Sequence, residues 1–354
     1  GNAQATVSWT APTNSGGSPI TGYKITSSPG GITVMSGVSP TSATVSGLTN
    51  GTSYTFTVKA TNAVGDSLAS AASNAVVPAT VPDAPTSVTA TPGNTQATVQ
   101  WTPPAGNGGS PITGYTVTST PGSFTANVGG STTMATVTGL ANGTSYTFVV
   151  RAANVLGTGA PSGASNAVVP ATLPGTPTGV TATRGDMQAT VQWVAPASTG
   201  GSPITGYTIT SSPGLVTATV GAGVTMGAVV GLTNGVSYTF TVHATNAVGS
   251  GPESGGSSAV TPAGVPFAPT AVSATPGNSQ ATVSWTTASA NGAAITGFTV
   301  TSTPGSFTAT AGAAVTNATV AGLANGTSYT FQVTATNVVG TSAPSVASSS
   351  VVPF

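Results

Sequence analysis

The chain has 354 residues, of which 38% are hydrophobic and only 2% are charged, and its formal net charge is zero. Typical soluble domains contain about 25% charged residues, so the charge content of this chain is unusually low. Disordered chains are poor in apolar residues and rich in charge, so the composition excludes a disordered protein. No run of about 18 apolar residues occurs, so the sequence predicts no membrane span. The chain has no cysteine, which excludes disulfide bonds and thiolate metal sites.

Short alternating runs predict strands from the first residues onward. QATVSW at 4–9 alternates apolar and polar residues, as do GYKITSS at 22–28, TSATVSGL at 41–48 and SYTFTVKATN at 53–62. Turn residues such as NSGGSP, SSPGG and TNGT separate these runs, and no stretch has a helical period. Short strands with frequent turns are typical of a β-sandwich.

The same pattern recurs four times along the chain. GGSPITGY stands at 16–23, 108–115 and 200–207, and a variant, NGAAITGF, stands at 291–298. The period is 92 residues, and each copy contains one tryptophan: Trp9, Trp101, Trp193 and Trp285. A period of this length suits a small domain that folds alone, because solenoid units that depend on their neighbours are shorter.

These motifs resemble the fibronectin type III family. In the first copy the similarity runs from Leu48 through the Asn-Gly-Thr turn and Tyr54 to Gly65, after a tryptophan on the second strand and Gly-Tyr on the third. The resemblance covers the whole chain and implies an all-β protein of four tandem, immunoglobulin-like β-sandwiches. It also implies a tryptophan in each core and a tyrosine corner in each copy, formed by a leucine and a tyrosine: Leu48 and Tyr54, Leu140 and Tyr146, Leu232 and Tyr238, Leu323 and Tyr329.

Proline-containing stretches mark the boundaries between the copies. We expect domains at 1–80, 81–172, 173–264 and 265–354, and the short, proline-rich connections predict a semi-rigid rod. Gly1 aligns with Gly93, so the first domain lacks its first strand and exposes a sheet edge. Either the protein continues upstream, which we favour, or another subunit supplies the strand. We expect the array to continue beyond both ends.

The sequence offers few groups for catalysis. His243 is the only histidine, and it aligns with Lys59, Arg151 and Gln332 at an outward strand position, which is typical of a solvated face. The acidic residues are scattered through loops and linkers: Asp66, Asp83, Asp186 and Glu253. We therefore expect no enzyme, no cofactor and no metal site. Without a phosphate loop or a basic stripe, nucleotides and nucleic acids are disfavoured as partners.

Two short motifs have both a structural and a functional interpretation. The triplet Arg184-Gly185-Asp186 resembles an adhesion motif, but it replaces Pro-Gly-Asn in the turn between the first and second strands, so we interpret it as a turn. Four sequons are candidate glycosylation sites, and three of them belong to an Asn-Gly turn that the fold itself requires: Asn50, Asn142, Asn317 and Asn325. Attached glycans would explain how so neutral a surface stays soluble.

The scarcity of charge bears on function because it removes the repulsion that keeps proteins apart. The sequence therefore predicts self-association into a homopolymer or surface assembly. We expect a structural, extracellular or cell-surface protein of a prokaryote, a subunit of a filament, sheath or surface layer. The alternative is an adhesin stalk or a spacer in a larger secreted or cell-surface protein, whose binding or catalytic part lies outside these residues.

Overall fold

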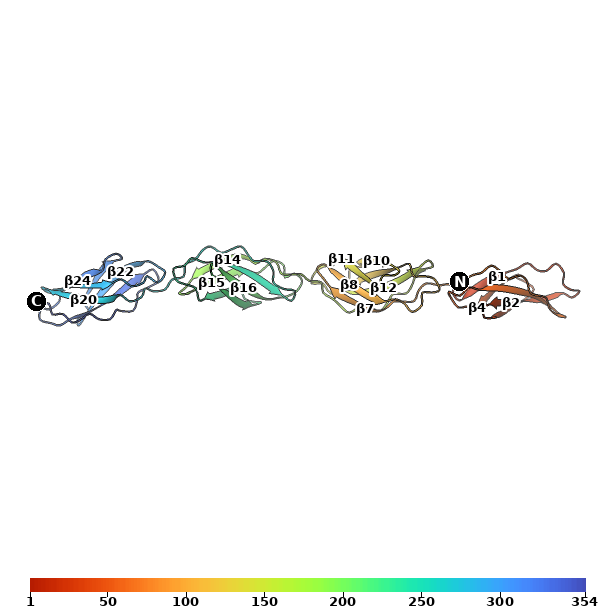
Figure 1. Ribbon diagram of the computed structural model, residues 1–354, viewed down its shortest axis with the longest axis horizontal. Coiled ribbons are helices and arrows are strands. Elements are labelled where there is room, and N and C mark those ends of the chain that lie inside the picture. Colours follow the sequence, from red (N-terminus) through yellow and green to blue (C-terminus); the bar gives the residue numbers. More distant parts are fainter. The chain divides into compact units, whose positions relative to one another are not determined.

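The computed structural model describes all residues from 1 to 354. It contains strands and turns arranged in eight sheets, two for each sequence copy. The prediction of an all-β chain of four sandwiches is therefore confirmed (Figure 1). The chain divides into two compact units, Gly1–Thr172 and Leu173–Phe354, with two sandwiches each. None of its segments is a helix long and apolar enough to cross a membrane.

The second sandwich shows the complete arrangement of strands. Its first sheet contains, in spatial order, β11 (Met134–Thr138), β8 (Gln96–Thr102) and β7 (Thr86–Pro92). Its second sheet contains β10 (Thr125–Gly129), β9 (Gly114–Thr120), β12 (Thr147–Asn154) and β13 (Gly157–Thr158). All neighbouring strands are antiparallel. Because successive side chains point to opposite faces, each sheet sends alternate residues, such as Val99 and Val117, into one shared core.

The first sandwich has the same two layers with one strand fewer. Its second sheet contains β3 (Thr33–Ser36), β2 (Ile20–Ser28), β5 (Thr55–Asn62) and β6 (Gly65–Asp66). Its first sheet contains only β1 (Gln4–Ser8) and β4 (Ser42–Ser46). The edge of β1 that corresponds to the β7 side of β8 therefore has no paired strand.

The second unit repeats this arrangement twice, with an isolated bridge in place of the short strand β13. In the third sandwich the first sheet contains β14 (Thr178–Arg184), β15 (Gln188–Val194) and β18 (Met226–Val230). The second sheet contains β17 (Thr217–Gly221), β16 (Ile204–Ser212) and β19 (Thr239–Asn246). In the fourth sandwich the first sheet contains β20 (Thr270–Gly277), β21 (Gln280–Thr286) and β24 (Asn317–Ala321). The second sheet contains β23 (Thr308–Gly312), β22 (Ile295–Thr303) and β25 (Thr330–Asn337).

The last segment of each sandwich pairs with the second sheet through serine side chains. In the second sandwich, Ser162 N donates to Val150 O at 2.9 Å, and Val150 N donates back to the Ser162 hydroxyl at 2.9 Å. Only every third residue faces the strand, so the segment follows a period of three rather than two, and the hydroxyl takes the place of a strand carbonyl. This serine ladder recurs in all four copies: Ser67, Ser70, Ser73; Ser162, Ser165; Ser254, Ser257; Ser342, Ser345, Ser348.

Candidate functional site

The titratable side chains make separate, local contacts. His243 Nδ1 lies 2.6 Å from Glu253 Oε1, and the Glu253 side chain is 47% exposed. Asp66 Oδ1 accepts a hydrogen bond from Thr61 Oγ1 at 2.7 Å. No group of three or more His, Cys, Asp or Glu residues comes together. Three of the four acids make separate local contacts: Asp66 with Thr61, Asp186 with Asn234, and Glu253 with His243.

The Arg184-Gly185-Asp186 triplet lies where β14 turns into β15. Gly185 N donates to Gln188 O at 2.8 Å and closes the turn. The Asp186 carboxylate accepts a hydrogen bond from Asn234 Nδ2 at 2.6 Å. In the second sandwich an asparagine pair makes the corresponding bond at 2.8 Å. The aspartate thus occupies a structural position that the other copies fill with asparagine.

Three of the four sequon asparagines use both ends of their amide within the fold. Asn142 Oδ1 accepts from Thr95 N at 2.9 Å, and Asn142 Nδ2 donates to Asn94 Oδ1 at 2.8 Å. Two further asparagines make the equivalent pairs: Asn50 and Asn325. Asn317 differs because it lies exposed at the start of β24, and its amide makes no hydrogen bond. Its sequon is the one whose amide nitrogen makes no hydrogen bond within the folded chain.

Each tyrosine of the corner motif accepts a hydrogen bond from a main-chain N–H five residues upstream. Tyr146 Oη accepts from Ala141 N at 3.1 Å, and the distances in the other copies are 3.0–3.1 Å. In the first copy this N–H, from Thr49, favours the phenolate and lowers the pKa of Tyr54. The four tyrosines and their leucines are buried in the cores: Tyr54, Tyr146, Tyr238, Tyr329, Leu48, Leu140, Leu232 and Leu323.

The tryptophans pack inside the sandwiches against an aromatic ring of the third strand. The ring centroids of Trp101 and Tyr115 are 5.2 Å apart, and the pair is tilted by 54°. Three tryptophans are 5% exposed: Trp101, Trp193 and Trp285. Trp9 is only half-buried. Burial in these cores raises the pKa of Tyr115 and of Tyr207, because it disfavours the charged phenolate.

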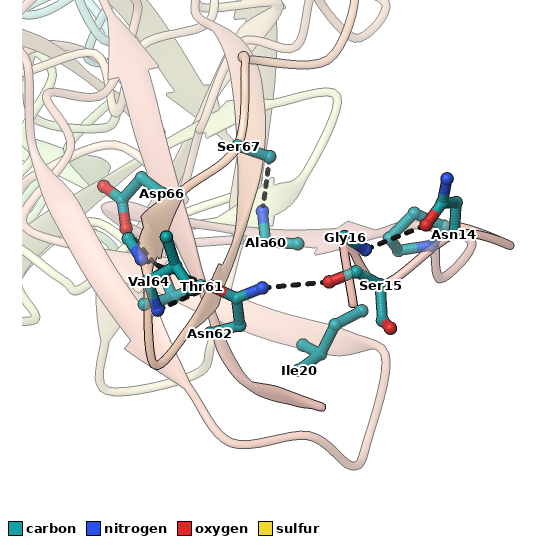
Figure 2. Close-up of a pocket in the computed structure, with 12 residues that line it drawn as sticks. Asn14, Ser15, Gly16, Ile20, Ala60, Thr61, Asn62, Val64, Asp66 and Ser67 are labelled. Atoms are coloured by element: carbon teal, nitrogen blue, oxygen red, sulfur yellow. Dashed lines mark hydrogen bonds between the residues drawn. The ribbon is translucent and has the colours of Figure 1, made fainter. Parts of the chain in front are cut away.

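An open groove lies on the first sandwich. It has a volume of about 510 Å³ and lies between residues 12–16 and residues 60–67 (Figure 2). The Asn62 side chain connects the two segments: its Nδ2 donates to Ser15 O at 2.9 Å, and its Oδ1 accepts from Val64 N at 2.9 Å. A second hollow of about 210 Å³ shares Pro12, Ala60 and Ser67 with the first and extends to Trp9. We call the two together the first-sandwich groove.

Within each unit, the glycine loop of one sandwich touches a turn of the preceding sandwich. A Cβ added to Gly109 would collide with Gly51 N, and a Cβ added to Gly292 would lie 2.7 Å from Gly235 N. In the second unit the contact includes a hydrogen bond of 2.8 Å from Asn234 Nδ2 to Asn291 Oδ1. The repeated Gly-Gly motif therefore does more than form a turn, because its second glycine also leaves room for the neighbouring sandwich.

Comparison with known proteins identifies the repeated domain. The family profile described as "Fibronectin type III domain" matches residues 1–76, 83–168, 175–260 and 267–351. Chitinase A1 of Niallia circulans is 42% identical over 173 residues, which are 46% of this chain and 23% of that protein.

Two proteins of Cellulomonas fimi match a longer part of the chain. Exoglucanase B is 32% identical over 264 residues, which are 70% of this chain and 23% of the relative. Endoglucanase B is 33% identical over 268 residues, which are 69% of this chain and 25% of the relative. The chain thus spans about a quarter of the length of these relatives.

Proposed function

Because this chain belongs to the fibronectin type III family, we propose that it is a non-catalytic spacer within a larger extracellular bacterial protein that acts on a polysaccharide. The observation that carries this proposal is the alignment with the two glucanases, which spans 69–70% of this chain but only 23–25% of each enzyme. The shared region is repetitive and lies within proteins that are named for their action on polysaccharides. A spacer accounts for such a region without requiring any chemistry from it.

The side chains support a spacer role. Several of the few titratable groups are engaged in local contacts, such as His243 with Glu253 and Asp66 with Thr61. With 2% charged residues, the surface exerts little electrostatic force on distant ionic partners. Such modules separate two functional parts without competing for the substrate of either part.

Co-sedimentation and hydrolysis assays test the spacer proposal. The purified chain is incubated with chitin and with cellulose, and we expect it to stay in the supernatant and to release no soluble sugar. Chitinase A1 of Niallia circulans, treated in the same way with chitin, is the positive control for sugar release. Sedimentation with either polymer would indicate a carbohydrate-binding role instead, and released sugar would indicate catalysis.

The low charge also favours a second candidate, the subunit of a filament, sheath or surface layer. The relatives support the spacer better, so self-association stays a prediction from the sequence. The two candidates differ in solution, because a filament subunit must bind its own copies and a spacer must not. Analytical ultracentrifugation over a range of concentrations separates them: a single monomeric species favours the spacer, and polymers that grow with concentration favour the filament.

A further inference from the structure

The dipeptide Asn-Gly is a site at which an asparagine side chain can be lost without an enzyme, because glycine has no side chain to shield its main-chain nitrogen from the neighbouring amide. That nitrogen bonds to the asparagine Cγ, the side-chain NH2 leaves with the glycine proton as ammonia, and a cyclic imide forms. Water then opens the ring to aspartate or isoaspartate. The chain contains six such pairs, which begin at Asn50, Asn107, Asn142, Asn234, Asn291 and Asn325.

Four of the six pairs lie in the turn that precedes each corner tyrosine, where hydrogen bonds hold both reacting groups. In the second sandwich, Gly143 N donates to Pro170 O at 2.9 Å, and the Asn142 amide is bound at both ends. In the other copies the equivalent glycine N–H also donates to a proline carbonyl, at 2.9–3.0 Å. The asparagine amides there are likewise bound at both ends. These bonds must open before the glycine nitrogen can attack.

The fifth pair, Asn291-Gly292, is held by neighbouring segments. Asn291 Oδ1 accepts from Asn234 Nδ2 at 2.8 Å, and Asn291 Nδ2 donates to Val265 O at 2.9 Å. Both residues of the pair are half-buried. The leaving amide nitrogen is therefore engaged in this pair as well.

The sixth pair, Asn107-Gly108, leaves the nucleophile and the leaving group free. Asn107 is exposed, and neither Gly108 N nor Asn107 Nδ2 makes a hydrogen bond. Asn107 Oδ1, in contrast, accepts from Gly109 N at 2.9 Å. When Cγ is attacked, negative charge develops on this oxygen, and a fixed N–H donor stabilises it. The local geometry thus favours the reaction at this pair.

The fold does not require an asparagine at position 107. The residue before the two loop positions that begin with Gly16, Gly108, Gly200 and Asn291 differs in every copy. The counterparts of Asn107 are Ser15, Thr199 and Ala290. The loop forms with each of these side chains, so the asparagine is the feature that makes the second copy reactive.

The reactive pair lies where the segment that connects the first two sandwiches is attached to the second. Thr80 N donates to Gly108 O at 2.8 Å, and Asn154 Nδ2 donates to Asn107 O at 3.0 Å and to Thr80 O at 2.7 Å. An isoaspartate adds one carbon to the main chain before Gly108, and the former Asn107 carbonyl becomes part of a carboxylate outside the main chain. Both carbonyl acceptors are therefore displaced, and the connecting segment loses part of its attachment.

We propose that Asn107-Gly108 is a self-modification site, at which deamidation weakens the attachment of the connecting segment to the second sandwich. In net terms the reaction consumes one water and releases one ammonia, so it needs neither an enzyme nor a cofactor. It is irreversible and adds a negative charge to a chain that has few. The proposal does not depend on the spacer role.

Ageing of the full chain in mildly alkaline buffer, followed by peptide mapping with mass spectrometry, tests the site. We expect the peptide that contains Asn107 to gain about 1 Da. Because the other five pairs must first break hydrogen bonds, we expect each to react at least about tenfold more slowly. Failure of Asn107 to gain mass, or equally fast reaction at any other pair, would overturn the proposal.

The same mapping in denaturant shows whether the fold is the origin of the selectivity. Without the fold, all six asparagines precede a glycine in a flexible chain, so we expect their rates to agree within about threefold. A preference for Asn107 of the same size in denaturant would refute the structural explanation, because local sequence alone would then account for it.

Hydrogen exchange at the Thr80 amide tests the effect on the connecting segment. The aged product is separated from the original chain by ion exchange, through its additional negative charge, and we expect Thr80 to exchange about tenfold faster in it. Asn107→Ser carries the residue of the first sandwich and is the matched control, because it keeps the loop but cannot form the imide. If ageing leaves exchange at Thr80 unchanged, or accelerates it equally in Asn107→Ser, the proposed weakening is wrong.

Discussion

Buried tyrosines in this chain have two different roles that the sequence alone does not distinguish. Tyr146 and Tyr115 both belong to the core of the second sandwich and are both almost completely buried. The hydroxyl of Tyr146 accepts the Ala141 N–H, whereas the fourth sandwich replaces the counterpart of Tyr115 with Phe298. Two similar buried tyrosines therefore have different roles, one polar and one apolar.

We expect Tyr146→Phe to lower the free energy of unfolding of the second sandwich by about 1–2 kcal/mol, because it leaves the Ala141 N–H without its acceptor. Tyr115→Phe is the control and should change the free energy by less than about 0.5 kcal/mol. Urea denaturation followed by circular dichroism measures both variants. Equal losses would show that the hydroxyl of Tyr146 contributes nothing beyond packing.

The sequons show what residue patterns cannot reveal. Asn142 and Asn317 both carry an Asn-x-Thr motif, so the sequence treats them alike. Only the fold brings Asn94 next to Asn142, across 48 positions in the chain, and so occupies its amide nitrogen. Long-range pairing of this kind leaves no local signal. Glycosylation itself stays a prediction for all four sites.

At the scale of elements, alternation predicted the strands well. The expected runs at 4–9, 22–28 and 53–62 overlap β1, β2 and β5. Alternation failed for the final segment of each copy, because its serines contact the neighbouring strand every third residue. A search for a period of three would have found Ser67, Ser70 and Ser73. Because strands were sought by a period of two, this segment was not predicted.

We expect Ser348→Ala to destabilise the fourth sandwich by about 1–2 kcal/mol, because it leaves the buried Phe331 N–H without the hydroxyl that accepts it at 3.1 Å. The adjacent Ser349 is exposed and lies outside the ladder, so Ser349→Ala should have almost no effect. Hydrogen exchange at the Phe331 amide gives a direct measurement. Unchanged protection in Ser348→Ala would contradict the ladder.

At the scale of the whole molecule, the sequence predicted four sandwiches, and the semi-rigid rod stays a prediction. The Gly-Gly loop was interpreted only as a turn, because its second role depends on residues of the preceding copy. Gly51 and Gly109 meet within the first unit although 58 positions separate them. Repetition in a sequence reveals the domain but not the contacts that one domain makes with the next.

Gly109→Ala and Gly17→Ala form a matched pair for this contact. Both glycines have a positive φ, +82° and +84°, so the backbone strain of the alanine is similar. Only at Gly109 would the added Cβ meet a neighbouring sandwich; at Gly17 it meets nothing within 4 Å. We expect Gly109→Ala to loosen the contact between the first two sandwiches, measured as faster hydrogen exchange at Gly51. Equal exchange in the two variants would contradict it.

The shifted pKa values of three tyrosines predict a pH dependence of stability in the alkaline range that differs between sandwiches. Burial raises the pKa of Tyr115 and Tyr207, so their contribution is fully present below about pH 10 and is lost as the pH rises through their folded-state values. The lowered pKa of Tyr54 acts in the opposite sense in the first sandwich. We expect Tyr115→Phe and Tyr207→Phe to reduce the alkaline loss, measured by thermal unfolding at pH 8 and pH 11. An unchanged loss would contradict this origin.

The contact between the Asn-Gly turn and the Gly-Gly loop also bears on how such a chain changes its number of copies. The turn in this contact is Asn-Gly in both units, and the loop is Gly-Gly in the first unit and Asn-Gly in the second. Each copy contains its own turn and its own loop. Unequal recombination between two copies, which removes or inserts one whole copy, therefore rejoins one such turn to one such loop. The protein can gain or lose material in steps of about 92 residues without inventing a new interface.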